Sequence, residues 1–264
     1  MAEGYLKSFM LPGVTVQSRG LYADGSPVSE NAVKVMAECG IDISGHISSN
    51  ISKNEADTDL FICVTATHEA YLIAAGIDRE KILTLSNIPD PFGADTEVYR
   101  ECRNKIFWDI DRIVFGSGLF SAVILPSEES GAEKMAELEK LTSSEPWSAA
   151  AITESMHAST LFYSAKVNGE LAGYIGMSVA ADEGYITNVA VFPEMRNRGI
   201  ATLLLNRVLS EARRRKLSFV SLEVRESNET AERIYEKLGF KVEGNRKDFY
   251  RFPTENAIIM TRRF

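Results

Sequence analysis

The stretch that decides the fold of the C-terminal half runs Val191-Phe192-Pro193-Glu194-Met195-Arg196-Asn197-Arg198-Gly199-Ile200-Ala201. Upstream of it, residues 185–191 are mainly β-branched or aromatic and predict a strand, which ends before Pro193 because proline cannot donate to a sheet ladder. Downstream, apolar residues from Ile200 to Ala212 recur at helical spacing. The stretch therefore predicts a strand, a short basic turn and an amphipathic helix.

The turn that precedes this helix is suited to an anion. The first N–H groups of a helix have no partner within it and lie at the positive end of the helix dipole. Gly199 allows a ligand to approach the main chain, and Arg196 and Arg198 add positive charge, which suits a phosphate or a pyrophosphate. A glycine and solvated charges are also ordinary in a strand-to-helix turn. The stretch alone leaves both interpretations open.

The motifs of the C-terminal half, taken together, resemble those of the GNAT acetyltransferase superfamily. Arg-x-x-Gly-x-Ala at residues 196–201, after the Val-x-Pro turn, resembles the loop that binds the pyrophosphate of acetyl-CoA. The resemblance covers residues 119–264 and implies a GNAT fold with a mixed central sheet. The segments that resemble the RimI-like ribosomal-protein alanine N-acetyltransferases are Glu145-Pro146-Trp147-Ser148, Leu222-Glu223-Val224-Arg225-Glu226-Ser227-Asn228, Ile234-Tyr235-Glu236-Lys237-Leu238-Gly239-Phe240 and Asn256-Ala257-Ile258-Ile259-Met260.

The resemblance implies acetyl-CoA as the co-substrate and gives roles to particular residues. It implies that Glu223 is the general base, acting directly or through water, and that Tyr235 reprotonates the departing CoA thiolate. It also implies that a backbone N–H of residues 189–191 holds the oxyanion and that transfer is direct. The residues implied in cofactor binding are Val189, Ala190, Val191, Arg196, Asn197, Arg198, Gly199, Ile200, Ala201, Thr202 and Asn228.

The residue pattern by itself allows structural roles at three of these positions. Residues 219–224 alternate, so that Glu223 lies opposite the apolar face of its strand, where a solvated surface position is the simpler interpretation. Tyr235 falls on the apolar stripe of a predicted helix and suits a core position. Asn228 precedes that helix and suits an N-cap, a role compatible with contact to a cofactor.

The substrate implied by the resemblance is the N-terminal alanine of a ribosomal protein. An α-amino group titrates near about 7.7–8.0, so at neutral pH it is mostly ammonium and needs a base before it can attack a thioester. Trp147, Tyr250 and Phe252 either line an aromatic peptide cleft or belong to the core. Two alternatives stay open: an acetyltransferase for lysine or small-molecule amines, and a bifunctional acetyltransferase and protein tyrosine phosphatase whose catalytic loop lies upstream of Met1.

The N-terminal half alternates predicted strands with predicted helices, which indicates an α/β domain with a mainly parallel sheet. The first expected elements are a helix at residues 1–11 and a strand at residues 14–18. Residues 1–4, 40–46 and 88–93 resemble the low-molecular-weight protein tyrosine phosphatases and their arsenate-reductase relatives. In that family the aspartate of an Asp-Pro loop is the general acid, which by position is Asp90. A rigid Pro-Asp-Pro turn is the structural alternative.

The nucleophile of that phosphatase family lies in a Cys-x5-Arg loop after the first strand, and the chain as numbered lacks this motif. The sixth residue after Cys39, Cys63 and Cys102 is glycine, glutamate and tryptophan respectively. Without a thiolate and an arginine to bind phosphate, the incomplete domain is expected to have no phosphatase activity. We expect that the gene begins upstream of Met1 or that the domain is a scaffold. Unpaired sheet edges, which a missing central strand would leave, favour the first.

Composition indicates an ordinary globular protein. The 264 residues suffice for two modest cores, and domains are expected at residues 1–115 and 119–264. The formal net charge of -8 argues against direct nucleic-acid binding, which favours a basic surplus. No apolar run approaches the ~20 residues that span a bilayer, and the first residues lack a signal-peptide pattern. Scattered cysteines and histidines predict a cytoplasmic protein without a metal site. The oligomeric state is left open.

Overall fold

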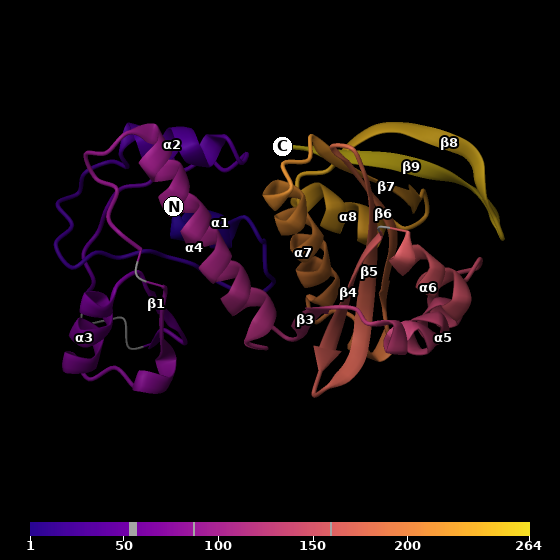
Figure 1. The fold of residues 1–264 in the computed structure, drawn as a ribbon, viewed down its shortest axis with the longest axis horizontal. Coiled ribbons are helices and arrows are strands. Elements are labelled where there is room, and N and C mark those ends of the chain that lie inside the picture. Colours follow the sequence, from indigo (N-terminus) through magenta and orange to yellow (C-terminus); the bar gives the residue numbers. More distant parts are fainter. Residues whose placement is uncertain (53–56, 87, 159) are drawn as a thin grey trace. The chain divides into compact units, whose positions relative to one another are not determined.

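The computed structural model describes residues 1–52, 57–86, 88–158 and 160–264. In this part of the chain there are two compact units (Figure 1). Unit 1 consists of Met1–Ser8 and Thr15–Arg112, and unit 2 consists of Phe9–Val14 and Ile113–Phe264. The domain limits expected from the sequence, 1–115 and 119–264, stay a prediction. These limits put residues 9–14 in the N-terminal domain, whereas in the structure these residues belong to unit 2.

Unit 1 has the expected α/β character with a parallel sheet. Its elements are α1 (Ala2–Lys7), α2 (Glu30–Ala37), β1 (Phe61–Cys63), α3 (Ala66–Ala74), the 3-10 turn η2 (Arg79–Lys81), β2 (Ile82–Thr84) and α4 (Thr96–Gly116), the last of which continues into unit 2. Strands β1 and β2 pair in parallel. Helix α2 begins after Ser29, because the Ser29 side chain accepts a hydrogen bond from the backbone N–H of Ala32 and caps the first turn.

Two expectations for the start of the chain are wrong. The first helix ends at Lys7 rather than near residue 11, and the left-handed backbone of Met10, with φ 50°, is incompatible with a helix that continues to residue 11. Residues 14–18 form no strand. The backbone N–H of Ser18 donates instead to Glu3 Oε2 at 3.0 Å, so a carboxylate takes the place of a ladder partner.

Unit 2 contains the expected mixed sheet, which has seven strands in the order β3-β4-β5-β6-β7-β9-β8. Among its described residues, β6 and β7 are the one parallel pair. Its elements are β3 (Val123–Pro126), η3 (Glu129–Gly131), α5 (Ala132–Thr142), α6 (Ala149–His157), β4 (Thr160–Val167), β5 (Glu170–Ala180), β6 (Glu183–Val191), η4 (Pro193–Met195), α7 (Ile200–Arg214), β7 (Phe219–Arg225), α8 (Glu229–Lys237), β8 (Lys241–Arg251) and β9 (Thr254–Arg263).

Strands β6 and β7 are paired only over their first residues. Their ladder ends where Ile186 lies opposite Leu222, whereas β6 stays paired with β5 as far as Val191. Thr187 is an extra residue in β6 between the pairs that flank it, which makes a β-bulge, and bulges bend a strand away from its neighbour. The two strands therefore diverge toward their carboxyl ends. We call the opening between them the wedge.

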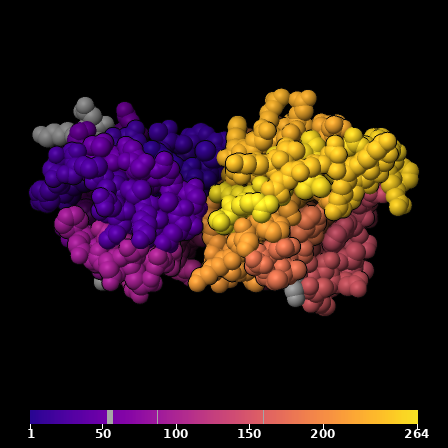
Figure 2. Space-filling view, turned by 90° about the horizontal axis from the view of Figure 1, so that it is seen from above, coloured from indigo at the N-terminus to yellow at the C-terminus, as the bar shows by residue number. Residues whose placement is uncertain are grey.

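Helices cover both faces of this sheet. Helix α7 packs on one face against β4, β5 and β6, and α5 and α6 pack on the other (Figure 1). On the α5 side, Tyr174 is fully buried and donates its hydroxyl to Glu139 Oε1 at 2.6 Å. The hairpin of β8 and β9 lies at the surface of unit 2, where its yellow residues are widely exposed (Figure 2). No described helix has both the length and the apolarity to cross a bilayer.

Residues Phe9–Val14, the crossing segment, are anchored to α7. The ring of Phe9 is fully buried, with its centroid 5.6 Å from that of Phe115. The backbone oxygen of Phe9 accepts a hydrogen bond from Asn206 Nδ2 at 2.7 Å, and this asparagine is itself buried. The crossing segment thus supplies both apolar packing and a hydrogen-bond partner to the core of unit 2.

Replacing Phe9 by alanine should destabilise unit 2. Loss of a fully buried phenylalanine typically lowers the free energy of unfolding by about 3–5 kcal/mol. Amide hydrogen exchange, read by mass spectrometry, should show faster exchange in α7 of the Phe9→Ala protein. The neighbouring Met10→Ala is the matched control, because Met10 is 56% exposed. Equal exchange in the two variants would contradict the anchoring role.

Candidate active site

The turn before α7 has the geometry that the sequence predicts for an anion site. Gly199 is the N-cap residue and has a left-handed backbone with φ +77°, and Asn197 also has a positive φ of 61°. No side chain caps the first turn of α7, and this turn carries no acidic residue. Its N–H groups are therefore available to a ligand at the positive end of the helix dipole. Arg196 and Arg198 are both exposed beside it.

The remaining predicted loop residues differ in what they can offer. Arg196 is partly engaged, because its Nε donates to the backbone oxygen of Val191 at 3.3 Å. The side chains of Ile200 and Thr202 are buried, so these two residues can contact a ligand only through their backbone N–H groups. Ala201 is half-buried between them.

Strand β6 turns two backbone N–H groups toward the wedge. The N–H of Phe192 bonds the carbonyl of Ala172 in the β5 direction at 3.0 Å. Because hydrogen-bonding directions alternate along an antiparallel strand, the N–H of Ala190 also faces β5, while those of Val189 and Val191 face the wedge. Two of the three predicted residues therefore present free donors, and Ala190 serves the ladder instead.

Glu223 lies at the mouth of the wedge, as the first residue of β7 beyond its last pair with β6. Its side chain is only 6% exposed, so the solvated surface interpretation is wrong. One carboxylate oxygen, Oε1, is 2.9 Å from Arg246 Nη1 of β8. The other, Oε2, accepts a hydrogen bond from the hydroxyl of Tyr185 in β6. The predicted alternation of β7 is confirmed, since the alternate residues of this strand are buried.

Tyr235 and Asn228 have the structural roles that the sequence allowed. Tyr235 is buried, with its ring edge-to-face against Phe240 at 5.9 Å between centroids. Burial, and secondarily Tyr250, raise the pKa of the Tyr235 phenol, which therefore stays protonated at neutral pH. Asn228 caps α8 by accepting the backbone N–H of Ala231 at 3.2 Å. A buried, protonated phenol is also what a proton donor requires.

The sequence did not single out the residues that surround Glu223. Arg225 shares its face of β7 and donates to Ser144 Oγ at 2.6 Å and to the backbone oxygen of Phe252 at 3.2 Å. Its guanidinium lies 4.1 Å from the centroid of the Tyr250 ring. Arg225 could have been found from the sequence, because it lies two residues after Glu223 on the same strand and therefore on the same face. Nothing in the sequence indicated Tyr185 or Arg246, because these residues contact Glu223 from other strands.

The three aromatic residues considered for a peptide cleft have different environments. Trp147 packs against the buried cluster under α5 and α6, which is the core alternative. Phe252 is 67% exposed at the tip of the β8–β9 hairpin. Tyr250 is half-buried against Arg225, and burial raises the pKa of its phenol. Tyr250 contacts Arg225 through its ring, whereas Phe252 contacts Arg225 only through its backbone oxygen.

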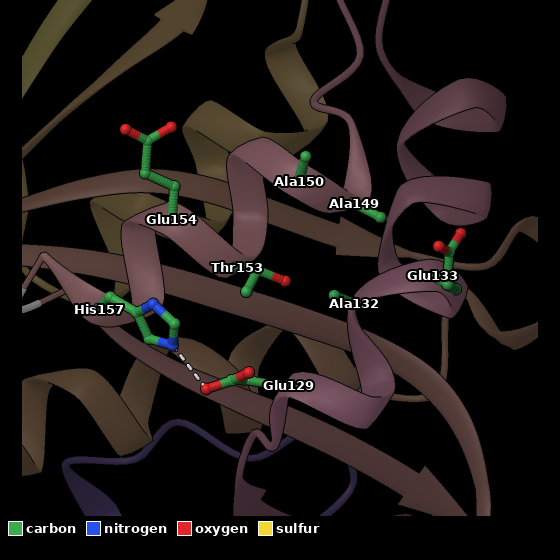
Figure 3. A pocket seen from close by; sticks show the side chains of 8 residues that line it. All are labelled: Glu129, Ala132, Glu133, Ala149, Ala150, Thr153, Glu154 and His157. Carbon is green, nitrogen blue, oxygen red and sulfur yellow. Dashed lines mark hydrogen bonds and ion pairs between the residues drawn. The ribbon is translucent and has the colours of Figure 1, made fainter.

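A shallow hollow of about 550 Å³ between η3, α5 and α6 lies apart from the predicted site (Figure 3). In it, the side chains of His157 and Glu129 point toward each other, with 2.6 Å between Nε2 and Oε1. None of the residues proposed from the sequence lines this hollow. The residues that do are Glu129, Ala132, Glu133, Ala149, Ala150, Thr153, Glu154 and His157.

In unit 1, Asp90 lies in an exposed turn, where its Oδ1 accepts the backbone N–H of Phe92 at 3.0 Å. Burial raises the pKa of the Cys63 thiol to about 11 and also raises that of Cys102. Thiols of this kind are poor nucleophiles at neutral pH. Across the residues that the structure describes, no cluster of histidine, cysteine, aspartate or glutamate is arranged to hold a metal ion.

Comparison with known proteins gives a separate result for each unit. Residues 132–240 match the model of the acetyltransferase (GNAT) family, and residues 1–113 match the model of the low molecular weight phosphotyrosine protein phosphatases. The chain is 34% identical over 119 residues to the [ribosomal protein bS18]-alanine N-acetyltransferase of Escherichia coli strain K12, covering 44% of this chain and 79% of the relative.

Other relatives agree with this division. A Bacillus subtilis (strain 168) relative named for the same alanine N-acetyltransferase activity is 37% identical over 93 residues, or 35% of this chain and 62% of that relative. The protein-arginine-phosphatase of Geobacillus stearothermophilus is 34% identical over 124 residues, or 43% of this chain and 83% of the relative. The crystal structure of the Escherichia coli S18-alanine N-acetyltransferase aligns with a TM-score of 0.51 and 28% identity, covering 54% of this chain and 93% of that one.

Replacing Gly199 by alanine should destabilise the turn before α7. An alanine pays about 1–2 kcal/mol in left-handed backbone, and its Cβ would lie 3.2 Å from Pro12 Cδ of the crossing segment. Gly169→Ala is the matched control, because Gly169 also has a positive φ but has open space around it. Urea unfolding should show the larger loss of stability for Gly199→Ala. Equal losses would mean that the Pro12 contact contributes nothing.

Proposed function

Because unit 2 belongs to the GNAT acetyltransferases and unit 1 to the low-molecular-weight phosphotyrosine protein phosphatases, we propose that the chain is an acetyl-CoA-dependent Nα-acetyltransferase for the N-terminal alanine of a ribosomal protein. The observation that carries this proposal is the position of Glu223. A buried carboxylate lies at the mouth of the wedge, on the strand next to the one that leads into the uncapped helix α7.

The residues of unit 2 fit the cofactor at two places. The first turn of α7 supplies unpartnered N–H groups for a pyrophosphate, from Gly199, Ile200, Ala201 and Thr202, with Arg196, Asn197 and Arg198 beside them. In the wedge, the N–H groups of Val189 and Val191 face the side that β7 leaves open, where an extended pantetheine could bond to them as a strand would. Asn228 is proposed to contact the cofactor from the start of α8.

The chemistry that unit 2 must supply is a proton acceptor, a place for negative charge and a proton donor. The peptide α-amine is mostly ammonium at neutral pH, and Glu223 takes its proton. A backbone N–H of Val189 or Val191 stabilises the oxyanion that forms when the amine attacks the thioester. Tyr235 donates its proton to the departing sulfur, and the phenol holds that proton at neutral pH.

The residues present in unit 1 support no phosphatase role of their own. None of the three cysteines is followed at the sixth position by an arginine, and two of them have raised thiol pKa values. Asp90 remains the proposed counterpart of the family's general acid, held in an Asx turn. We therefore assign the proposed activity to unit 2.

Acetyl transfer to an alanine-starting peptide should depend on Glu223 and Tyr235. Each of Glu223→Gln and Tyr235→Phe should lower kcat by about 10²–10⁴-fold, the range of a positioned acid or base, while calorimetry shows CoA binding retained. The exposed Glu183→Gln and Tyr22→Phe are the matched controls and should behave as the unaltered protein. Full activity in both site variants would rule out these roles.

The same assay separates the proposed substrate from the lysine alternative. An alanine-starting peptide is compared with its N-blocked, lysine-containing counterpart, with product located by mass spectrometry. Transfer to the α-amine alone supports the proposal. Preferential transfer to the lysine would replace it by a lysine acetyltransferase.

A further inference from the structure

Tyr185 and Glu223 form a pair in which one member is accessible and the other is not. Tyr185 lies opposite Ser221 in the parallel ladder of β6 and β7, one pair before the ladder ends. Glu223 follows Ser221 by two residues along β7. The side chains of Tyr185, Ser221 and Glu223 therefore project from the same face of the sheet. The Tyr185 hydroxyl donates to Glu223 Oε2. Tyr185 is 36% exposed, whereas the Glu223 side chain is 6% exposed.

The remaining oxygen of Glu223 is also occupied. Arg246 Nη1 lies 2.9 Å from Oε1, and the Arg246 guanidinium rests 5.5 Å from the centroid of the Phe249 ring. An incoming ammonium therefore meets the Tyr185 hydroxyl before it meets a free carboxylate oxygen. Direct contact with Glu223 would first require breaking the tyrosine hydrogen bond or the arginine ion pair.

We propose that Tyr185 is a catalytic residue that relays the proton of the substrate amine to Glu223, an inference that rests on the proposed acetyltransferase function. The phenol oxygen accepts a proton from the ammonium, and the N–H bond breaks to leave the nitrogen lone pair free. At the same time the original phenol proton passes to Glu223 Oε2. The phenol is neutral before and after the step, the carboxylate becomes a carboxylic acid, and no other reactant is needed.

The surroundings of Tyr185 suit a relay and not a base. Burial, and next the hydrogen bond to Glu223, raise the pKa of the Tyr185 phenol, so it keeps its proton at neutral pH. The charged and titratable groups that act on it are Glu223 of β7 and Arg246 and Tyr250 of β8. A phenol that stays protonated can exchange one proton for another without becoming charged.

The test is Tyr185→Phe, which removes the relay oxygen and keeps the ring. At pH 7, kcat for the alanine-starting peptide should fall about 10²-fold, near the lower limit for a positioned acid–base group. The fall should shrink as pH rises above the amine pKa of about 7.7–8.0, because the amine is then already neutral. CoA binding should be unchanged, which shows that the variant is folded. Tyr22→Phe, 95% exposed, is the control.

A double variant separates a relay from a supporting role. If Tyr185 and Glu223 act in one proton path, Tyr185→Phe should cause no further loss in a Glu223→Gln protein. A defect that is the same at all pH values, or that multiplies with that of Glu223→Gln, would overturn the relay while leaving the acetyltransferase function in place. If the unaltered protein binds no CoA and acetylates no amine, the function and the relay both fail.

Discussion

The early end of the β6–β7 ladder is the constraint on which the rest of unit 2 depends. Buried backbone N–H and C=O groups need partners, and a parallel ladder would normally supply them along the whole of both strands. Here the bulge at Thr187 turns β6 aside after Ile186, so that Val189 and Val191 face an opening and not a neighbour. The same divergence places Glu223 at the mouth of the opening. One bend in β6 therefore leaves the N–H groups of Val189 and Val191 facing the wedge and places Glu223 at its mouth, on the strand next to the one that leads into α7.

The charged side chains around the wedge, Glu223 and Arg225, are stabilised by contacts from several strands. Glu223 is a buried carboxylate, and such a group is tolerated only when it is paired and hydrogen-bonded. Arg246 and Tyr185 meet this need from β8 and β6. Arg225, two residues along β7, bonds the loop before α6 and the tip of the β8–β9 hairpin. Arg225 therefore links β7 to the loop before α6 and to the hairpin tip, while Glu223 links β7 to β6 and β8.

The parts of this arrangement that were predictable from the sequence are local. Pro193 ended a strand, Gly199 marked the turn before a helix, and Asn228 marked a cap, because each depends on backbone geometry within a few residues. The alternation of β7 predicted which face carries Glu223. The pattern could not reveal that this carboxylate is buried, since its burial comes from side chains on two other strands.

Features that depend on contacts between distant parts of the chain were not predictable from local patterns. The strand expected at residues 14–18 was lost to a hydrogen bond from Ser18 to Glu3, and no periodicity reports such a competitor. Ala190 was expected to contact the cofactor with its neighbours, but alternation along β6 turns its N–H toward β5. Which N–H groups face an opening depends on the register between strands, and this register was not visible in the residues themselves.

The path of the chain through the two units has a consequence for how they can be inherited. Chain order runs from unit 1 to unit 2 at Phe9, back at Thr15, and again to unit 2 at Ile113. A gene fragment that starts at Ile113 would encode a core without the Phe9 ring, which lies beside Phe115, and would leave the Asn206 amide with the Thr202 backbone oxygen but without that of Phe9. Recombination at a single point therefore cannot pass on unit 2 intact. Units 1 and 2 must therefore be inherited together for unit 2 to keep residues 9–14, although each unit has relatives that exist without the other.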